Sequence, residues 1–260
     1  MCTIGGLLYR DKTFLLKSYD YDPFPVAWAH FETLDERLPH FALVNHGQHG
    51  INSGLNTAGL ALQISRSVDV QPPDRQVPTT EHQEVRTVLN ADVLARFSDV
   101  PSAVAHIEEF ARTHPDMYGG NVMLADSGHL SVTEYFNGVV KSETTTEGWL
   151  ARANHSVFGI VDNMDVAAKY RSGPRCDRMI AFLRDLFPEV PQMDRESIID
   201  CCKSLLREPP ILGEKTRSSF VIDVQQRRVD YMIGEGPWRT FQFASEFGSE
   251  AFDATLSFVG

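Results

Sequence analysis

Short apolar runs separated by polar turns dominate the first quarter of the chain. The first two runs, residues 2–9 and 13–21, are joined by the polar tripeptide at 10–12. This pattern predicts a β-hairpin that has Cys2 as its first residue. Glycine and asparagine interrupt the apolar runs that follow, which is typical of short strands joined by tight turns. We expect these further strands at residues 39–47, 50–56 and 59–67.

The spacing changes after residue 80, where apolar residues recur every three or four positions. This periodicity predicts two amphipathic helices, at residues 81–97 and 98–114. Ser98 is the expected N-cap of the second helix, and Pro101 suits its first turn.

The second half of the chain returns to strands and then repeats the helical pattern. Residues 119–144 read as strands, with a hairpin turn at 126–129. Helical spacing follows at 175–187 and 195–206, and residues 217–237 read as a final pair of strands. Strands in groups with pairs of helices between them indicate an α+β fold of layered antiparallel sheets. We expect the first hairpin and the last strands to share a core, so residues 1–260 form one domain.

Composition excludes several classes of function. The net charge of −11 argues against a nucleic-acid partner, because phosphate binding requires an excess of Lys and Arg. The chain has no apolar run of about 18 residues and no signal-peptide pattern, so neither a membrane span nor a leader is expected. Its four cysteines show no metal-binding spacing, which is consistent with free thiols and a cytoplasmic location. Whether the chain forms a homo-oligomer is left open by the sequence.

Cys2 directly follows the initiator methionine. Removal of Met1 would leave one residue that carries both a thiol and a free α-amine, with ordinary pKa values near 8.5 and 7.7–8.0. The amine can then accept the thiol proton, so the residue is a nucleophile with its own base. The simpler interpretation is that Cys2 is only a small buried hydrophobic residue.

Four separated stretches resemble one enzyme family, the N-terminal nucleophile (Ntn) hydrolases. They are "CT…LLKSYDYD" with Cys2 and Asp20, "SGLNTAGLAL" with Asn56, "ARANHS" with Asn154, and "SGPRCDRMIAFLRDL" with Arg175. Within the family, they are similar to the branch of conjugated bile acid hydrolases, penicillin V acylases and isopenicillin N acyltransferase. The resemblance implies a four-layer αββα sandwich, with Cys2 at the end of a central strand. It also implies that the bond broken is an amide or a thioester.

The resemblance assigns a catalytic role to each matching residue. Asp20, which alternation favours over Asp22, orients the α-amine, and Asn154 donates its amide N–H to the developing oxyanion. Arg175 supplies a positive charge that favours the thiolate. The alternatives are structural: a carboxylate that caps a strand end, an asparagine in a turn, and a surface ion pair at a helix start.

The chain departs from the family pattern in its expected substrate contacts. Lys17 and Ser18 stand where the bile acid hydrolases carry Arg and Asn. Ser65 or Arg66 lies where those enzymes have a second oxyanion-hole asparagine, and Arg66 is also a candidate to bind a substrate carboxylate or phosphate. The substrate-binding candidates are therefore Lys17, Asn56, Ser65 and Arg66.

Other chemistries find less support in the sequence. His46, His49 and His82 lack metal-ligand spacing, and no G-x-S-x-G elbow or phosphate-binding loop occurs. Neither a metal nor an organic cofactor is expected. The sequence thus predicts an N-terminal-cysteine amidohydrolase or acyltransferase, acting on a small N-acyl amide or acyl thioester through a Cys2 thioester. The alternative is a non-catalytic protein that binds a ligand or partner on the same fold and retains Met1.

Overall fold

The computed structural model describes most of the chain. It covers residues 2–20, 25–32, 37–45, 50–66, 80–162, 164–169 and 171–243. Asp22, His46 and His49 lie outside these ranges, and His82 is described only as part of a helix.

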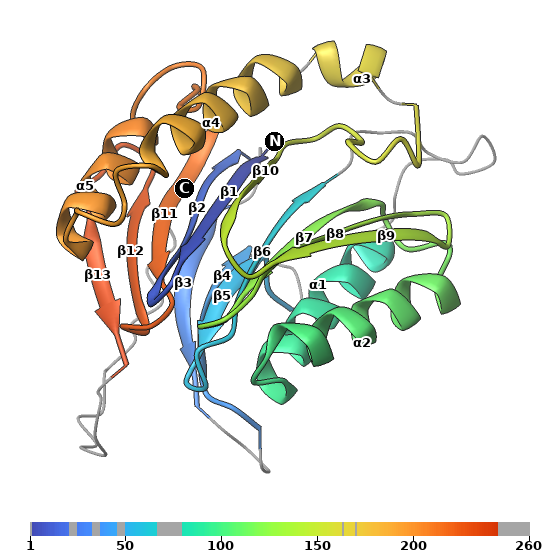
Figure 1. The fold of residues 1–260 in the computed structure, drawn as a ribbon. Helices are drawn as coiled ribbons and strands as arrows, with labels where there is room; N and C mark the ends of the chain where they lie inside the picture. The colour runs from blue at the N-terminus through green and yellow to red at the C-terminus, as the bar shows by residue number, and fades with distance from the viewer. Residues whose placement is uncertain are drawn as a thin grey trace.

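Two antiparallel β-sheets stack face to face at the centre of the molecule (Figure 1). The first, sheet A, has the strand order β10 (Gly148–Arg152), β1 (Cys2–Tyr9), β2 (Lys12–Asp20), β11 (Thr216–Asp223), β12 (Arg228–Ile233) and β13 (Arg239–Gln242). The second, sheet B, has the order β3 (Val26–Phe31), β4 (His40–Asn45), β5 (Ser53–Asn56), β6 (Ala61–Arg66), β7 (Gly120–Ala125), β8 (Leu130–Phe136) and β9 (Val139–Thr145). The predicted first hairpin is therefore central to sheet A, with β10 on one side and β11 on the other.

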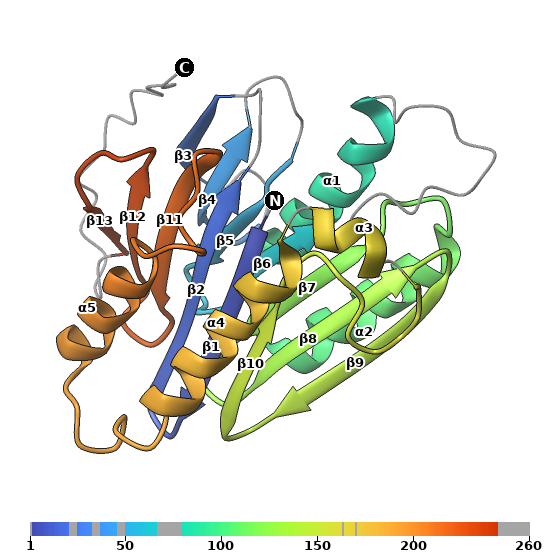
Figure 2. The ribbon, with the colours of Figure 1, turned by 90° about the horizontal axis from the view of Figure 1, so that it is seen from above.

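Helices cover the outer face of each sheet (Figures 1 and 2). Sheet B carries α1 (Thr80–Arg96) and α2 (Val100–Thr113), and sheet A carries α4 (Ser172–Leu186) and α5 (Arg195–Leu205). The short α3 (Met164–Lys169) precedes α4. None of the helices in the described part of the chain is long and apolar enough to cross a membrane.

Three layers of buried side chains hold these four layers of structure together. One cluster fills the space between the sheets and includes Cys2, Leu15, Phe41, Met123 and Phe220. A second lies between sheet B and its helices, and a third between sheet A and its helices. Each sheet contributes side chains to two of these layers, because successive side chains along a strand point to opposite faces of the sheet. The predicted α+β, αββα sandwich is confirmed.

Local predictions from the sequence differ from the structure in a few places. The N-cap of α2 is Asp99, whose side chain accepts the N–H of Ser102, so the prediction of Ser98 was wrong by one residue. A carboxylate at this position also interacts favourably with the helix dipole. Strands β3, β10 and β13 and helix α3 were not predicted, because each is short and none shows clear alternation or helical spacing.

Candidate active site

Cys2 begins β1 at one end of sheet A, between β10 and β2. Its side chain belongs to the buried layer between the sheets, and only 5% of the residue is exposed. The side-chain oxygen Oδ1 of Asn154, which follows β10, accepts the N–H of Cys2 at 2.9 Å. The atom that Met1 removal would convert to an α-amine is therefore held by an asparagine 152 residues away in the chain.

Asn154 is itself fixed by two further segments. Its side-chain Nδ2 donates to the carbonyl of Arg66 at the end of β6, at 2.5 Å. Its backbone N–H donates to Oγ of Ser172, the first residue of α4, at 2.8 Å. The side-chain amide thus links Cys2 to sheet B. Donation to an oxyanion by the second N–H of the same Nδ2 stays a prediction.

Asp20 and Arg175 form a buried ion pair. Nη1 of Arg175 lies 2.7 Å from Oδ2 of Asp20, and the two side chains are 5% and 9% exposed. Oγ1 of Thr216 donates to the other carboxylate oxygen at 2.7 Å. Buried ion pairs need such additional hydrogen bonds to offset the desolvation of both charges. The pair joins the end of β2 to α4, so two of the predicted catalytic residues contact each other.

The predicted catalytic residues lie on both faces of the β1–β2 hairpin. Cys2 pairs with Tyr19 in the ladder, and both side chains lie in the layer between the sheets. Ser18 instead donates to the carbonyl of Ile211, which belongs to the layer beneath α4 and α5. Asp20 shares the parity of Ser18, and its partner Arg175 comes from α4. The ion pair therefore lies on the helix side of the hairpin, opposite the face that carries the Cys2 side chain.

Lys17 lies on the same face as Cys2 and is fully buried. Its Nζ donates to Oδ1 of Asn52 and, at 2.9 Å, to Oγ of Ser53, both at the start of β5. Burial is the main reason that the pKa of Lys17 falls from 10.5 to about 8. Among the smaller effects, Cys2 raises this pKa, Arg86 lowers it and Asp20 raises it.

Ser65 and Arg66 lie beside the segment that carries Asn154. Oγ of Ser65 donates to the carbonyl of Ala153 at 2.6 Å and accepts from Nδ2 of Asn121 at 3.1 Å. The guanidinium of Arg66 lies 4.6 Å from the ring centroid of Tyr118. Both residues thus support Asn154 through the backbone, whereas the substrate contacts expected of them remain predictions.

Asn56 is not brought to Cys2. Its Nδ2 donates to the carbonyls of Leu94 and Phe97 near the end of α1, and its Oδ1 accepts the N–H of Leu60. These bonds close the turn between β5 and β6 and fix it to the helix. Asn52 and Ser53, which contact Lys17, lie at the other end of that short stretch.

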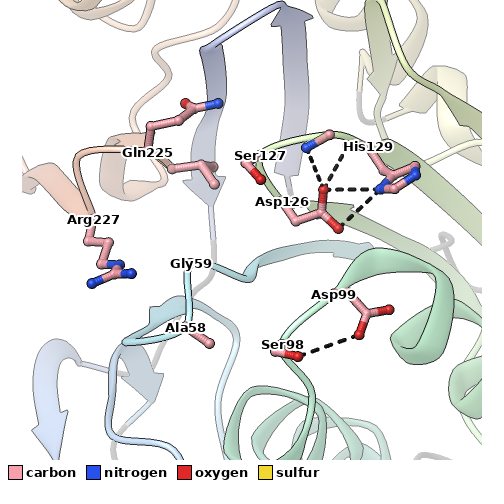
Figure 3. A pocket seen from close by; sticks show the side chains of 11 residues that line it. Ala58, Gly59, Ser98, Asp99, Asp126, Ser127, His129, Gln225 and Arg227 are labelled. Carbon is pink, nitrogen blue, oxygen red and sulfur yellow. Dashed lines mark hydrogen bonds and ion pairs between the residues drawn. The ribbon is translucent and has the colours of Figure 1, made fainter.

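A polar cavity of about 370 Å³ adjoins the Asn56 turn (Figure 3). It also borders Val224, whose N–H donates to the carbonyl of Thr13 near the start of β2. Because Cys2 pairs with the other end of β2, this cavity lies at the opposite end of sheet A from the thiol. Its lining residues are Ala58, Gly59, Ser98, Asp99, Asp126, Ser127, Gly128, His129, Val224, Gln225 and Arg227.

Sequence reasoning missed Glu134 as a residue that organises the site. This fully buried carboxylate on β8 accepts the hydroxyl of Ser156 and, at 3.0 Å each, the N–H groups of Val157 and Phe158. It thereby fixes the segment directly after Asn154. The available signal was a glutamate at an inward position of an alternating strand, where an acidic side chain needs a specific partner.

The chain is similar to known proteins in its structure but not detectably in its sequence. No family model matches the sequence, and no curated protein matches it. Solved structures do match over most of the chain. Penicillin V acylase from Agrobacterium tumefaciens aligns with a TM-score of 0.63 and 15% identity, over 91% of this chain and 85% of that one.

Two further structures show the same likeness. An N-acylethanolamine-hydrolyzing acid amidase ortholog from Caenorhabditis elegans has a TM-score of 0.61 and 14% identity, over 86% of this chain and 93% of the other. The C2A mutant of conjugated bile acid hydrolase from Clostridium perfringens has a TM-score of 0.58 and 12% identity, covering 95% and 94% of the two chains. All three are Ntn hydrolases, and at these identities the likeness establishes that the chain has the fold of that family.

Proposed function

We propose that the mature protein, without Met1, is a cysteine amidohydrolase or acyltransferase of the Ntn type. Its substrate is a small N-acyl amide or acyl thioester, and the acyl group is carried as a thioester on Cys2. The observation that supports this most strongly is the hydrogen bond of 2.9 Å between the nitrogen of Cys2 and Oδ1 of Asn154. The likeness in fold to an acylase and an amidase also supports a catalytic role for a terminal cysteine at this position.

In the proposed reaction, Cys2 supplies both nucleophile and base. The α-amine accepts the thiol proton, and Sγ attacks the carbonyl carbon of the substrate. The bond from the carbonyl carbon to the leaving nitrogen of an amide, or to the leaving sulfur of a thioester, then breaks. The protonated amine returns the proton to that leaving atom, and the acyl group remains as a thioester on Cys2. Water completes hydrolysis, or an acceptor amine completes acyl transfer. The acceptor oxygen of Asn154 binds one amine N–H and so limits the orientations open to the amine.

The surrounding contacts favour a preorganised site. Asn154 is bonded to Cys2, Arg66 and Ser172, which belong to sheet A, sheet B and α4. The Asp20–Arg175 pair joins the same helix to β2. Positions defined by several independent contacts keep reacting groups in place at no further entropic cost during the reaction. Such a site lets a small chain act without a cofactor.

Trapping the acyl-enzyme tests the proposal. The protein is incubated with a panel of N-acyl amides and acyl thioesters, quenched with acid, and digested for mass spectrometry. We expect one acyl group on the peptide that begins with Cys2, and none in a Cys2→Ala variant that keeps the fold. An adduct on another residue, or no adduct and no turnover from any member of the panel, would favour the non-catalytic binding protein instead.

A further inference from the structure

Building on the proposed function, we propose that Glu134 is a positioning residue, which holds the side-chain amide of Asn154 against the nitrogen of Cys2. In the described part of the chain, Glu134 forms its hydrogen bonds with the segment that follows Asn154. It therefore acts on the site through the backbone, from the inner face of sheet B, and does not touch the reacting atoms.

The inner face of sheet B changes from apolar to polar at one end. Met123 and Val132 belong to the layer between the sheets. Asn121 and Glu134 lie two residues from them on the same strands, so their side chains point into the same layer. Asn121 lies opposite both Ser65 and Glu134 in the strand ladders. These three fully buried residues, Ser65, Asn121 and Glu134, form what we call the polar row.

Two members of the polar row hold the residue before Asn154. Oγ of Ser65 donates to the carbonyl of Ala153 at 2.6 Å, and Nδ2 of Asn121 donates to the same carbonyl at 3.2 Å. The side chain of Asn154 donates to the carbonyl of Arg66, the neighbour of Ser65 on β6. The chain therefore reaches Asn154 with its backbone already fixed to sheet B.

Glu134 holds the chain where it continues beyond Asn154. One carboxylate oxygen accepts the hydroxyl of Ser156, and the other accepts the N–H groups of Val157 and Phe158 at 3.0 Å each. An ionised carboxylate accepts at both oxygens and donates nowhere, so it suits a segment that presents three donors. Hydrogen bonds to a charged group are also stronger than neutral ones.

Stability alone gives little reason for a carboxylate at this position. Glu134 is fully buried, and in the ranges that the structure describes it forms no ion pair. Arg152, which precedes Asn154 on β10, pairs with Glu143 instead. The donors of the segment must therefore offset the whole desolvation of the charge. What Glu134 provides in return is a defined position for that segment.

A backbone that is fixed on both sides limits the movement of the Asn154 side chain. Oδ1 of Asn154 accepts the N–H of Cys2 at 2.9 Å, and its backbone N–H donates to Oγ of Ser172 at 2.8 Å. Loss of the Glu134 contacts would free the following segment from sheet B and let the amide shift with it. Small displacements of an orienting group slow a reaction that depends on orientation.

Acylation of the mature protein by 4-nitrophenyl acetate tests this role without knowledge of the natural substrate. Sγ of Cys2 attacks the ester carbonyl, the thiol proton passes to the α-amine, the carbon–oxygen bond breaks, and 4-nitrophenolate leaves. Its release gives the rate, and mass spectrometry locates the acetyl group. Glu134→Gln keeps the shape of the side chain but turns an N–H group toward the donors of the segment. We expect it to slow acylation of Cys2 about tenfold or more.

The same substitution in an Asn154→Ala background separates positioning from general damage. Because no amide is left to displace, Glu134→Gln should slow acylation less than about twofold in that background. An equal factor in both backgrounds would overturn the proposal. The matched control is Glu143→Gln, since Glu143 also binds this part of the chain, through Arg152, but its side chain is half exposed. We expect an unchanged rate in this control.

Hydrogen exchange of residues 155–160 gives a readout that needs no reaction. Glu134→Gln should speed exchange in this segment and leave the β1–β2 hairpin unchanged. Should that variant fail to fold, Ser156→Ala removes only one of the three donors and should show the same pattern with a smaller effect. Unchanged exchange, or unchanged acylation in both variants, would overturn the inference. A wild-type protein whose Cys2 is not acylated at all would instead contradict the proposed function.

Discussion

At the scale of single residues, the site depends on side chains that are buried and committed to specific partners. Asn154 contacts Cys2, Arg66 and Ser172, and Lys17 of sheet A contacts Asn52 and Ser53 at the start of β5 in sheet B. A buried polar group that loses its partner incurs the full cost of desolvation, so these contacts are difficult to replace. The cost for Lys17 also depends on pH, because its pKa differs between the folded and unfolded chain.

We predict that Lys17 makes folding stability rise with pH. Below pH 8 both states carry the Lys17 proton, whereas between pH 8 and 10.5 the unfolded chain binds more protons than the folded one. Stability contributed by this group must therefore increase across that window, by up to about 3 kcal/mol. Urea unfolding of the wild type and Lys17→Met at pH 7.5 and pH 10 measures it. The wild type should gain stability relative to the variant at the higher pH, and a constant difference would contradict the burial of the ammonium.

Alternation predicts part of this arrangement from the sequence. Once the hairpin register is known, Cys2, Lys17 and Tyr19 can be placed on one face of sheet A. Cys2 lies opposite Tyr19, and Lys17 is two residues from Tyr19 on the same strand. The contact between Asp20 and Arg175 cannot be found in this way, because it depends on how α4 packs on sheet A. A local sequence pattern predicts which side chains share one face of a strand or helix. It does not predict a contact between residues 155 positions apart, which depends on tertiary packing.

At the scale of elements, α4 connects the predicted motifs. Its first residue, Ser172, accepts the N–H of Asn154, and Arg175 one turn later pairs with Asp20. Arg171 occupies the N-cap position of this helix, and its side chain makes no capping hydrogen bond. Ser172 thus directs its hydroxyl toward the neighbouring segment, and tertiary contacts fix the start of α4.

We predict that Arg175→Met destabilises the fold by about 3–5 kcal/mol, because it leaves the Asp20 carboxylate buried without its partner. Arg178→Met is the matched control on the same helix. Its pair with Glu208 is largely exposed, so its loss should cost at most about 1 kcal/mol. Chemical denaturation measures both, and equal effects would show that the buried pair is not the anchor of α4.

The elements themselves were predictable where their pattern was long and regular. The first hairpin, the two helix pairs and the turn at 126–129 all lie where spacing and turn residues placed them. The edge strands β3 and β13, and β10 beside Cys2, escaped prediction because they are four to six residues long. Their positions are determined by neighbouring strands more than by their own sequence.

At the scale of the whole molecule, the site forms where the two sheets and α4 meet. Sheet A supplies Cys2 and Lys17, sheet B supplies the carbonyl of Arg66, and Asn154 links the sheets. The segment after β10 is fixed in turn by Glu134 of sheet B. The site therefore exists only when both sheets are packed together. The cavity beside Asn56 lies at the other end of this assembly and is not used by the proposed chemistry.

The fold could be anticipated from the order of strands and helices together with four short motifs, although no family model and no curated protein matches the sequence. Of those motifs, the one around Asn154 contacts Cys2, whereas Arg175 contacts Asp20 on the opposite face of the same hairpin. Asn56, in another motif, closes the β5–β6 turn and bonds to α1. A motif can thus identify a fold correctly even where one of its residues makes structural hydrogen bonds away from Cys2.

The central claim is that Cys2 becomes the amino terminus and acts as its own base. The mass of the intact, purified protein tests this most directly. The account predicts a chain that lacks one methionine, and blocking its terminal amine should abolish acyl-enzyme formation. A full-length mass with Met1 retained on protein that still forms the Cys2 acyl-enzyme would contradict it.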